Sequence, residues 1–238
     1  RFERFFQYVR LDDGCVARLL VHIMGLKDKP WHLAVDRTNW KFGRCHINIL
    51  MLGIVHEKIC IPLFWVLLDK AGNSNARERT DLMGRLHEAF PNQSIASLSG
   101  DREFIGEKWM SWLESQGIPF VLRLKENMHV WTENYVPLKL SAHAGHLGKR
   151  QSAILKGTWY LGRDPSKATT PIKIAMMRLK TGEMLIVAAS RIRIKTALPI
   201  YRNRWGIETL FSALKTRGLR LENTHMTSPH KLATLMSV

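Results

Sequence analysis

Apolar residues recur along the chain with two spacings, and they predict an ordered series of helices and strands. Residues 1–29 carry apolar positions at helical spacing, which predicts one or two helices. The run 31–36 is a short apolar strand that ends on a carboxylate, Asp36. The apolar stretches 47–55 and 59–68 are separated by three polar residues and predict an antiparallel pair that continues from this strand.

The next segment alternates between helical and strand patterns. Residues 76–90 predict an amphipathic helix, and 95–98 predict a buried strand that stops at Ser99-Gly100-Asp101. Another helix is expected over 106–116 and another strand over 119–124. The order of three strands, helix, strand, helix, strand predicts an α/β fold, in which a mixed sheet carries helices on both faces.

After residue 124 the composition of the chain changes twice. From about 126 to 183, scattered Gly, Pro, Thr and Lys surround short β-like runs at 153–160 and 172–179, and we interpret this stretch as a β-rich insertion. A further strand is expected over 184–189. Residues 195–217 then predict one long helix.

Charge and cysteine content narrow the class of protein. The chain has 36 Lys and Arg against 20 Asp and Glu, a formal charge of +16, which attracts polyanions and favours a nucleic-acid partner. A basic chain can also simply be soluble, so charge alone does not settle the partner. Three widely spaced cysteines without a CxxC pair give neither a disulfide framework nor a zinc site, and a reducing cytoplasm fits them.

Membrane and nucleotide-binding classes are disfavoured. The longest strongly apolar run, 59–68, is about half the length that spans a bilayer, and no secretory signal is visible at the start. The Gly145 to Arg150 segment lacks the spacing of a phosphate loop, and no GxGxxG follows a strand. We therefore expect no membrane association and no nucleotide cofactor.

The predicted long helix carries an unusual set of polar residues. At about 100 degrees per residue, Tyr201, Arg204, Glu208 and Lys215 fall within roughly 60 degrees of one another. An ordinary amphipathic helix with an Arg204–Glu208 ion pair explains this pattern equally well when it is taken alone. However, Asp36 also ends an apolar strand, as does Asp101, and three carboxylates in one cleft need a cation such as magnesium to stay ionised.

These residues resemble those of a known family. Tyr201-Arg202-Asn203-Arg204-Trp205-Gly206-Ile207-Glu208, continued to Lys215, is similar to the Tyr-2-Arg-3-Glu-6-Lys signature of DDE transposases of the IS-four type. The segments Ala34 to Trp40 and Gly100 to Phe104 resemble the first and second acidic motifs of the same family. The resemblance runs from about Trp31 to Lys215, most of the chain.

The resemblance implies an RNase H-like catalytic domain over 31–238, with its β-rich insertion at about 126–183. Residues 1–30 are then a helical segment at the end of a longer N-terminal region. A bacterial, cytoplasmic, nucleoid-associated protein is expected. Its partner is double-stranded DNA, both transposon ends and target, bound by a homodimer.

The resemblance also assigns roles to single residues. Asp36, Asp101 and Glu208 become the catalytic ligands of two divalent metal ions, Mg²⁺ or Mn²⁺. Water nicks the DNA at the transposon end, and the freed 3′-hydroxyl attacks the opposite strand or the target in cut-and-paste transposition. A hairpin intermediate is expected from the family. Tyr201, Arg204 and Lys215, which belong to the same signature as Glu208, match positions that contact DNA phosphates in the family.

Two tryptophans of the expected insertion carry an open alternative. Trp131 and Trp159 could stack on a base flipped out of the duplex, or they could form the small core that a short β-rich segment needs. Trp40, Trp65, Trp109 and Trp112 lie within apolar patterns and are expected in the core.

Two other functions stay in competition with transposition. One is a transposase remnant that binds DNA but has no activity. The other is an RNase H-like nuclease that cuts DNA without strand transfer.

Overall fold

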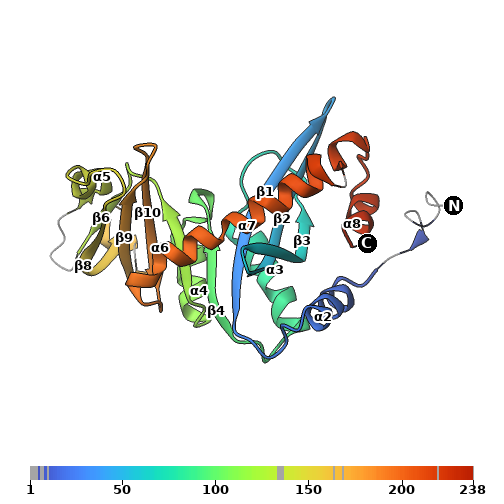
Figure 1. Cartoon of the computed structure of the whole chain (residues 1–238), viewed down its shortest axis with the longest axis horizontal. Coiled ribbons are helices and arrows are strands. Elements are labelled where there is room, and N and C mark those ends of the chain that lie inside the picture. The colour runs from blue at the N-terminus through green and yellow to red at the C-terminus, as the bar shows by residue number, and fades with distance from the viewer. Residues whose placement is uncertain are drawn as a thin grey trace. The chain divides into compact units, whose positions relative to one another are not determined.

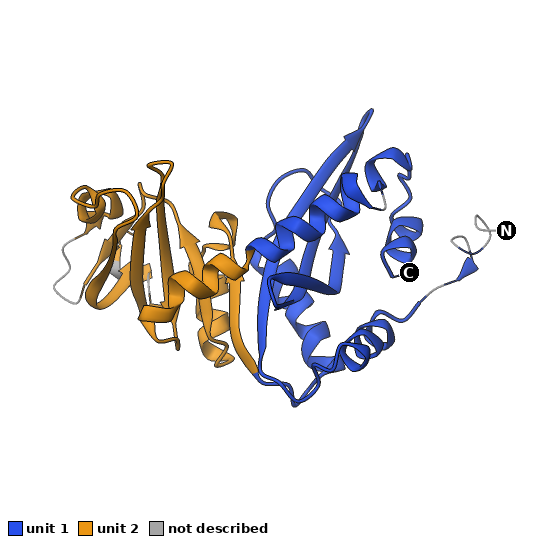
Figure 2. Cartoon of the chain, in the orientation of Figure 1, with its two compact units in different colours: residues 1–94, 205–238 blue, residues 95–204 orange. Residues whose placement is uncertain are grey.

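The computed structural model describes residues 5, 8, 9, 11–132, 137–162, 164–167, 169–218 and 220–237. Parts of the expected N-terminal segment (residues 1–4, 6, 7 and 10) and of the expected insertion (133–136, 163 and 168) lie outside the described residues. The chain forms two compact units (Figure 2): unit 1 is residues 1–94 and 205–238, and unit 2 is residues 95–204.

Unit 1 is built on a three-stranded antiparallel sheet in the order β3-β2-β1. The predicted strand 31–36 and the predicted antiparallel pair are confirmed, and β1 extends six residues beyond Asp36. The helix predicted over 76–90 is confirmed as well. The elements of unit 1, of which Figure 1 labels the α-helices and strands, are α2 (Asp13–Ile23), β1 (Trp31–Phe42), β2 (Cys45–His56), β3 (Ile59–Leu67), α3 (Ala76–Ala89), α7 (Trp205–Ser212), the π-helical turn η3 (Ala213–Arg217), the 3-10 turn η4 (Leu221–Asn223) and α8 (Pro229–Ser237).

Helices cover both faces of this sheet. Alternate residues of a strand point to opposite faces, so Ala34 and Trp40 lie on one face of β1 and Trp31 on the other. The first face packs in a core cluster with Ile207 of α7, and the cluster also takes in Leu232 of α8. On the second face, Trp31 meets the ring of Phe90 at the end of α3, with ring centroids 4.9 Å apart.

Unit 2 holds a mixed sheet in the order β4-β5-β10-β9-β8-β6-β7, in which β4 and β5 are parallel and the other described pairs are antiparallel. The strands and helices predicted between 95 and 189 are confirmed to within a few residues. The elements of unit 2 are β4 (Ile95–Gly100), the 3-10 turn η1 (Arg102–Phe104), α4 (Glu107–Ser115), β5 (Phe120–Leu124), β6 (His129–Trp131), β7 (Leu138–Lys139), α5 (Leu140–Ala144), β8 (Ser152–Leu161), the 3-10 turn η2 (Pro165–Lys167), β9 (Ile172–Arg178), β10 (Met184–Ser190) and α6 (Ile194–Asn203).

Helix α6 packs on one face of this sheet. Its buried residues Ala197 and Tyr201 join Val121 of β5, Ala175 of β9 and Val187 of β10 in one core cluster. The residues of β5 that point to the opposite face are buried too, so the sheet is covered on both sides. The region 126–183 carries strands β6 to β9, and it is therefore β-rich as predicted.

The single helix predicted over 195–217 is wrong. The structure divides the segment into α6, α7 and η3, with Arg204 between the first two. Pro199 lies inside α6, where it removes one backbone donor, and the N–H of Arg204 bonds to the carbonyl of Tyr201 three residues back. Geometry calculated for one straight helix therefore does not hold along the whole segment.

None of the helices in the described part of the chain combines the length and apolar character that spanning a bilayer needs.

Candidate active site

Asp36 lies in the middle of β1, not at the end of a strand as predicted. The strand continues because Trp40 is buried and the following residues keep pairing with β2. Asp36 is opposite Met51 in the register, and its carboxylate accepts a hydrogen bond of 2.8 Å from the N–H of Arg37. It shares the face of β1 on which Ala34 packs against α7. Asp36 is thus a half-buried carboxylate on the face that α7 covers.

The residue next to Asp36 anchors this part of the strand. The Arg37 guanidinium donates to the side-chain oxygens of Asn48 at 2.9 Å and of Asn73 at 3.3 Å. Asn48 is buried and donates in turn to the carbonyls of Lys70 and Gly72. The network joins β1 and β2 to the loop after β3 and fixes the backbone that carries Asp36.

The negative charge of Asp36 affects the pKa of a buried thiol, that of Cys60. Cys60 is 5% exposed at the start of β3 and belongs to the core cluster of α7 and the sheet. Burial first, and the negative charge of Asp36 second, raise the pKa of Cys60 to about 12.

Cys60 is therefore expected to resist alkylation in the folded protein. The thiolate is the reactive form, and at pH 8.5 a thiol with so high a pKa is almost fully protonated. With iodoacetamide at this pH, mass spectrometry of peptides should find Cys15, which is exposed, labelled and Cys60 unlabelled. Denaturant should make both react. Equal labelling rates in the folded protein would contradict the burial of Cys60.

Glu208 lies on α7, and the sequence of this helix allows it to pack closely on the sheet. Ile207 and Phe211 are buried in the core cluster, whereas Glu208 is half-buried at the edge of that face. A Cβ atom at Gly206 would come within 2.9 Å of the carbonyl oxygen of Lys58 and 3.1 Å of the N atom of Cys60. Because glycine has no Cβ, α7 can lie against the beginning of β3. Unit 1 thus holds the helix of Glu208 against the sheet that carries Asp36.

Asp101 follows β4 directly, as predicted, and lies in unit 2. Its carboxylate accepts a hydrogen bond of 3.3 Å from the hydroxyl of Tyr201. Its backbone carbonyl accepts from the N–H of Phe104 and closes the turn η1. The structure thus brings together two of the predicted site residues, Asp101 and Tyr201, which are far apart in the sequence.

Tyr201 and Arg204 are both buried in unit 2, with exposed fractions of 6% and 5%. The Arg204 guanidinium lies over the Tyr201 ring, 5.2 Å from its centroid. Burial raises the pKa of Tyr201 to about 12, the charge of Arg204 acts in the opposite direction, and that of Asp101 adds to the rise. The hydroxyl therefore stays protonated at neutral pH and can donate to Asp101.

Lys215 is placed in unit 1 by contacts with β1. Its ammonium donates to the carbonyl of Asn39 at 2.7 Å, lies 5.6 Å from the Trp40 ring centroid and forms an ion pair of 3.4 Å with Glu222. Contact between Lys215 and DNA stays a prediction.

The two tryptophans of the expected insertion are packed inside unit 2. Trp131 is 5% exposed and stacks on the Tyr160 ring, with centroids 4.4 Å apart. Trp159 is 8% exposed, meets His143 edge to face and donates to the carbonyl of Lys156. Their packing matches the small core that one alternative expected, while base stacking stays a prediction. Of the tryptophans expected in the core, Trp40, Trp65 and Trp109 are buried, and Trp112 is half-buried and stacks on Trp109.

The three acidic residues are divided between the units, with Asp36 and Glu208 in unit 1 and Asp101 in unit 2. Carboxylate oxygens are the donors that hard divalent ions take, so the chemistry of this set suits magnesium or manganese. Within the described residues, no three or more His, Cys, Asp or Glu side chains form a group that could hold a metal ion.

A charge network beside Asp101 was not found from the sequence. The carboxylate of Glu183 accepts from Arg123 at 2.5 Å and also from Arg102. Burial raises the pKa of Glu183, but the charges of the Arg123 and Arg102 guanidinium groups outweigh this effect. The pKa of Glu183 therefore lies below its ordinary value. These partners are 60 and 81 residues apart in the chain, so no local pattern could have joined them.

The chain matches the model of a known family. Residues 27–237 match the family described as the transposase DDE domain, and this range contains Asp36, Asp101 and Glu208. No curated protein matches the chain.

Solved structures are similar to this chain at low sequence identity. A piggyBac transposase synaptic complex with hairpin DNA has a TM-score of 0.52 and 12% identity, with 99% of this chain and 55% of that chain covered. This chain thus spans about half of that transposase. Endonuclease V of Ciona intestinalis, in complex with a 24mer DNA, has a TM-score of 0.42 and 10% identity over 84% of this chain and 95% of that chain. The TM-score is 0.37 for the catalytic domain of human endonuclease V, at 14% identity over 94% and 93% of the two chains. The predicted fold class, an RNase H-like α/β fold with a mixed sheet and flanking helices, is confirmed.

Proposed function

The chain belongs to the family of transposase DDE domains, and we propose that it is a DNA transposase that cuts and rejoins double-stranded DNA at transposon ends. The family match over 27–237 carries this proposal. The formal charge of +16 supports it, because a polyanionic substrate is drawn to a basic protein. Membership of the IS-four type rests on the signature residues Tyr201 to Lys215 and is part of the proposal.

Asp36, Asp101 and Glu208 are the proposed metal ligands. All three are half-buried carboxylates. Asp36 lies on β1 and Glu208 on α7 of unit 1, and Asp101 directly follows β4 of unit 2. Metal binding by the complete set requires that the two carboxylates of unit 1 meet Asp101 of unit 2. A pair of divalent ions, when bound, activates the attacking oxygen and stabilises the leaving oxygen at a phosphodiester.

The residues of the chain orient the carboxylates for this task. Tyr201 holds one oxygen of Asp101 through its hydroxyl, and the Arg37 N–H holds one oxygen of Asp36. Each bond limits the rotation of a carboxylate. The Arg204 guanidinium lies over the ring of Tyr201. Contact of Tyr201, Arg204 and Lys215 with DNA phosphates is proposed with the catalytic role.

The proposed reaction has two steps. Water attacks the phosphorus at the transposon end, the bond to the 3′-oxygen breaks, and that oxygen takes up a proton and becomes a free hydroxyl. The hydroxyl then attacks a phosphorus of the opposite strand or of the target, and a second 3′-oxygen leaves with a proton. Attack on the opposite strand gives a hairpin, and the piggyBac transposase of similar fold has been captured with hairpin DNA. Base stacking by Trp131 or Trp159 and a homodimer on paired ends belong to the same proposal.

A cleavage and joining assay tests this function. The protein is mixed with duplex DNA that carries the element's own ends, with a target plasmid and with Mg²⁺ or Mn²⁺, and the products are resolved on denaturing gels. We expect metal-dependent nicks and joined products, and we expect Asp36→Ala to give neither.

Each alternative function predicts a different result. Nicks without joined products favour an RNase H-like nuclease. DNA binding without any cut, and no difference between the wild type and Asp36→Ala, favours an inactive remnant and contradicts the proposed transposase.

A further inference from the structure

A basic pocket lies in unit 2 where the end of β9 meets the end of α6. Its volume is about 460 Å³, and four of its six lining residues are cationic whereas none is acidic. We call it the basic pocket. It is lined by Arg150, Met177, Arg178, Leu179, Lys180 and Arg202.

One of its four cations has a structural role. The guanidinium of Arg178 is half-buried and donates to the carbonyls of Leu147 and Gly182. By contrast, Arg150, Lys180 and Arg202 are exposed. Among the described residues, no carboxylate forms an ion pair with any of these three. Their charges are therefore available to an anion from outside the chain.

Backbone hydrogen bonding places Arg150 at the edge of the pocket. Arg150 has a φ of 66°, in the left-handed region that favours glycine. Its N–H donates to the carbonyl of Arg178 at 2.7 Å, which fixes it at the edge of the pocket. The backbone of Arg150 is thus held in place while its side chain is exposed to solvent.

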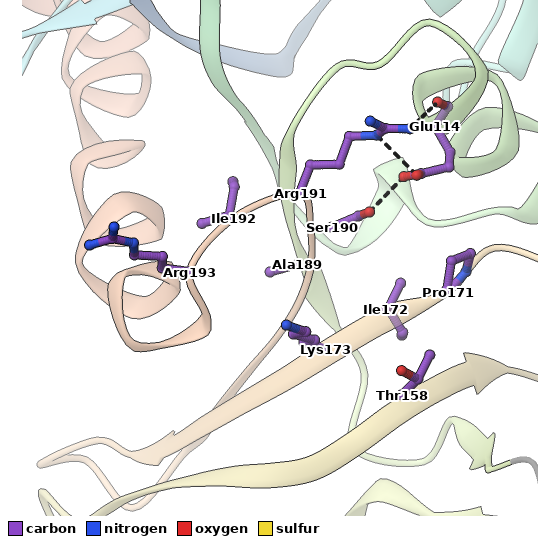
Figure 3. A pocket seen from close by; sticks show the side chains of 10 residues that line it. All are labelled: Glu114, Thr158, Pro171, Ile172, Lys173, Ala189, Ser190, Arg191, Ile192 and Arg193. Atoms are coloured by element: carbon purple, nitrogen blue, oxygen red, sulfur yellow. Dashed lines mark hydrogen bonds and ion pairs between the residues drawn. The ribbon is translucent and has the colours of Figure 1, made fainter.

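A second pocket, at the other end of α6, provides a contrast (Figure 3). It contains Lys173, Arg191 and Arg193, but Glu114 lies in its wall. Glu114 accepts from Ser190 at 2.6 Å and from Arg191 at 3.0 Å, so one of the three cations is already neutralised. The basic pocket has no such acid and is the stronger anion site of the two.

We infer that the basic pocket binds the backbone phosphates of duplex DNA, an inference that rests on the proposed function. Arg and Lys side chains suit phosphate oxygens, and exposed cations bind DNA by releasing its counterions. Backbone contacts of this kind set the register of a protein on DNA without reading its sequence.

Helix α6 links this pocket to Asp101. Tyr201 points into the core of unit 2 and donates to Asp101, while the next residue, Arg202, is exposed and lines the basic pocket. Consecutive residues of a helix point about 100° apart, which explains how one helix serves both places. A phosphate held by Arg202 is thus placed at a fixed distance from Asp101, because both belong to unit 2.

The test is the salt dependence of DNA binding by the full chain with Arg150→Gln, Lys180→Gln and Arg202→Gln combined. The dissociation constant for duplex DNA is measured by fluorescence anisotropy at several salt concentrations. If each cation neutralises one phosphate, the slope of log K against log salt falls in magnitude by roughly 2 to 3. Each single variant should lower the magnitude of this slope by about 0.9. The single variants keep the test valid if the triple variant does not fold.

A matched control removes three charges that already have acidic partners: Arg18→Gln, Arg77→Gln and Lys167→Gln. These cations form ion pairs with Asp12, Asp81 and Asp164. The control should change the slope by less than about 1. Equal slopes for the two triple variants would overturn the inference, and so would a pocket variant that loses only the binding of inorganic phosphate.

Cleavage by the wild type separates this inference from the proposed function. If the wild type cuts and joins DNA but the pocket variant keeps the wild-type slope, the basic pocket is not a DNA contact while the proposed function stands. If the wild type binds DNA without cutting it and the slopes differ as expected, the pocket is supported and the transposase activity is not. If the wild type does not bind DNA, both fail.

Discussion

Glu208→Gln is expected to abolish cleavage and joining while DNA affinity stays within a few-fold of the wild type. The substitution keeps the size of the side chain but removes the negative charge that a divalent metal ligand needs. Loss of such stabilisation in the transition state amounts to several kcal/mol, or roughly 10³-fold in rate. Binding depends on the distributed positive charge and should survive. Single-turnover cleavage and anisotropy with the same DNA measure the two effects.

Glu88→Gln is the matched control for this experiment. Glu88 is an exposed glutamate of α3 in the same unit, so the same change of charge is made away from α7. It should leave both cleavage and binding unaltered. If Glu208→Gln lowers affinity instead, with cleavage unaltered at saturating DNA, Glu208 is a binding residue and the proposed ligand set is incorrect.

The strands of both units could be predicted because their pattern is local. In β1, buried Leu33 and Val35 point to one face and Ala34 and Trp40 to the other, and continuous apolar stretches locate β2 and β3. Helix α3 could be predicted from Leu82 and Leu86, which recur at helical spacing and are both buried. Such signals involve residues only a few positions apart, so a single sequence contains them.

The organisation of the candidate site could not be predicted in the same way. The bond from Tyr201 to Asp101 joins residues 100 positions apart, and that from Lys215 to Asn39 joins residues 176 apart. Periodicity says which side of a helix a residue occupies but not which partner it meets. Periodicity also predicted a single helix over 195–217. In the structure, Tyr201 and Arg204 belong to unit 2, whereas Glu208 and Lys215 belong to unit 1.

Gly206→Ala is expected to destabilise the fold and to slow cleavage, although alanine usually favours a helix. The added Cβ would meet backbone atoms, namely the carbonyl oxygen of Lys58 at 2.9 Å and the carbonyl carbon of Ile59 at 3.0 Å. Backbone cannot move aside as a flexible side chain can, so α7 must shift. Overpacking of this kind costs about 1–3 kcal/mol, and thermal or denaturant unfolding measures it.

The shift matters for catalysis because Glu208 is only two residues further along α7. A displacement of about 1 Å in a catalytic group can lower the rate roughly 10²-fold. Cleavage is therefore expected to fall even at temperatures where the variant is fully folded. A variant that is less stable but cleaves at the wild-type rate when folded would show that the close approach of α7 to β3 does not position Glu208.

Gly84→Ala provides the control of opposite sign. Gly84 is an exposed glycine inside α3, and a Cβ there would meet no atom within 4 Å. Alanine at that position should stabilise the protein by about 0.5–1 kcal/mol, because it lowers the entropy lost on forming the helix. The same substitution in two helices of unit 1 then has opposite effects, since only Gly206 lies against the backbone of a strand. If both variants gain stability, α7 does not lie on β3 as closely as the structure describes.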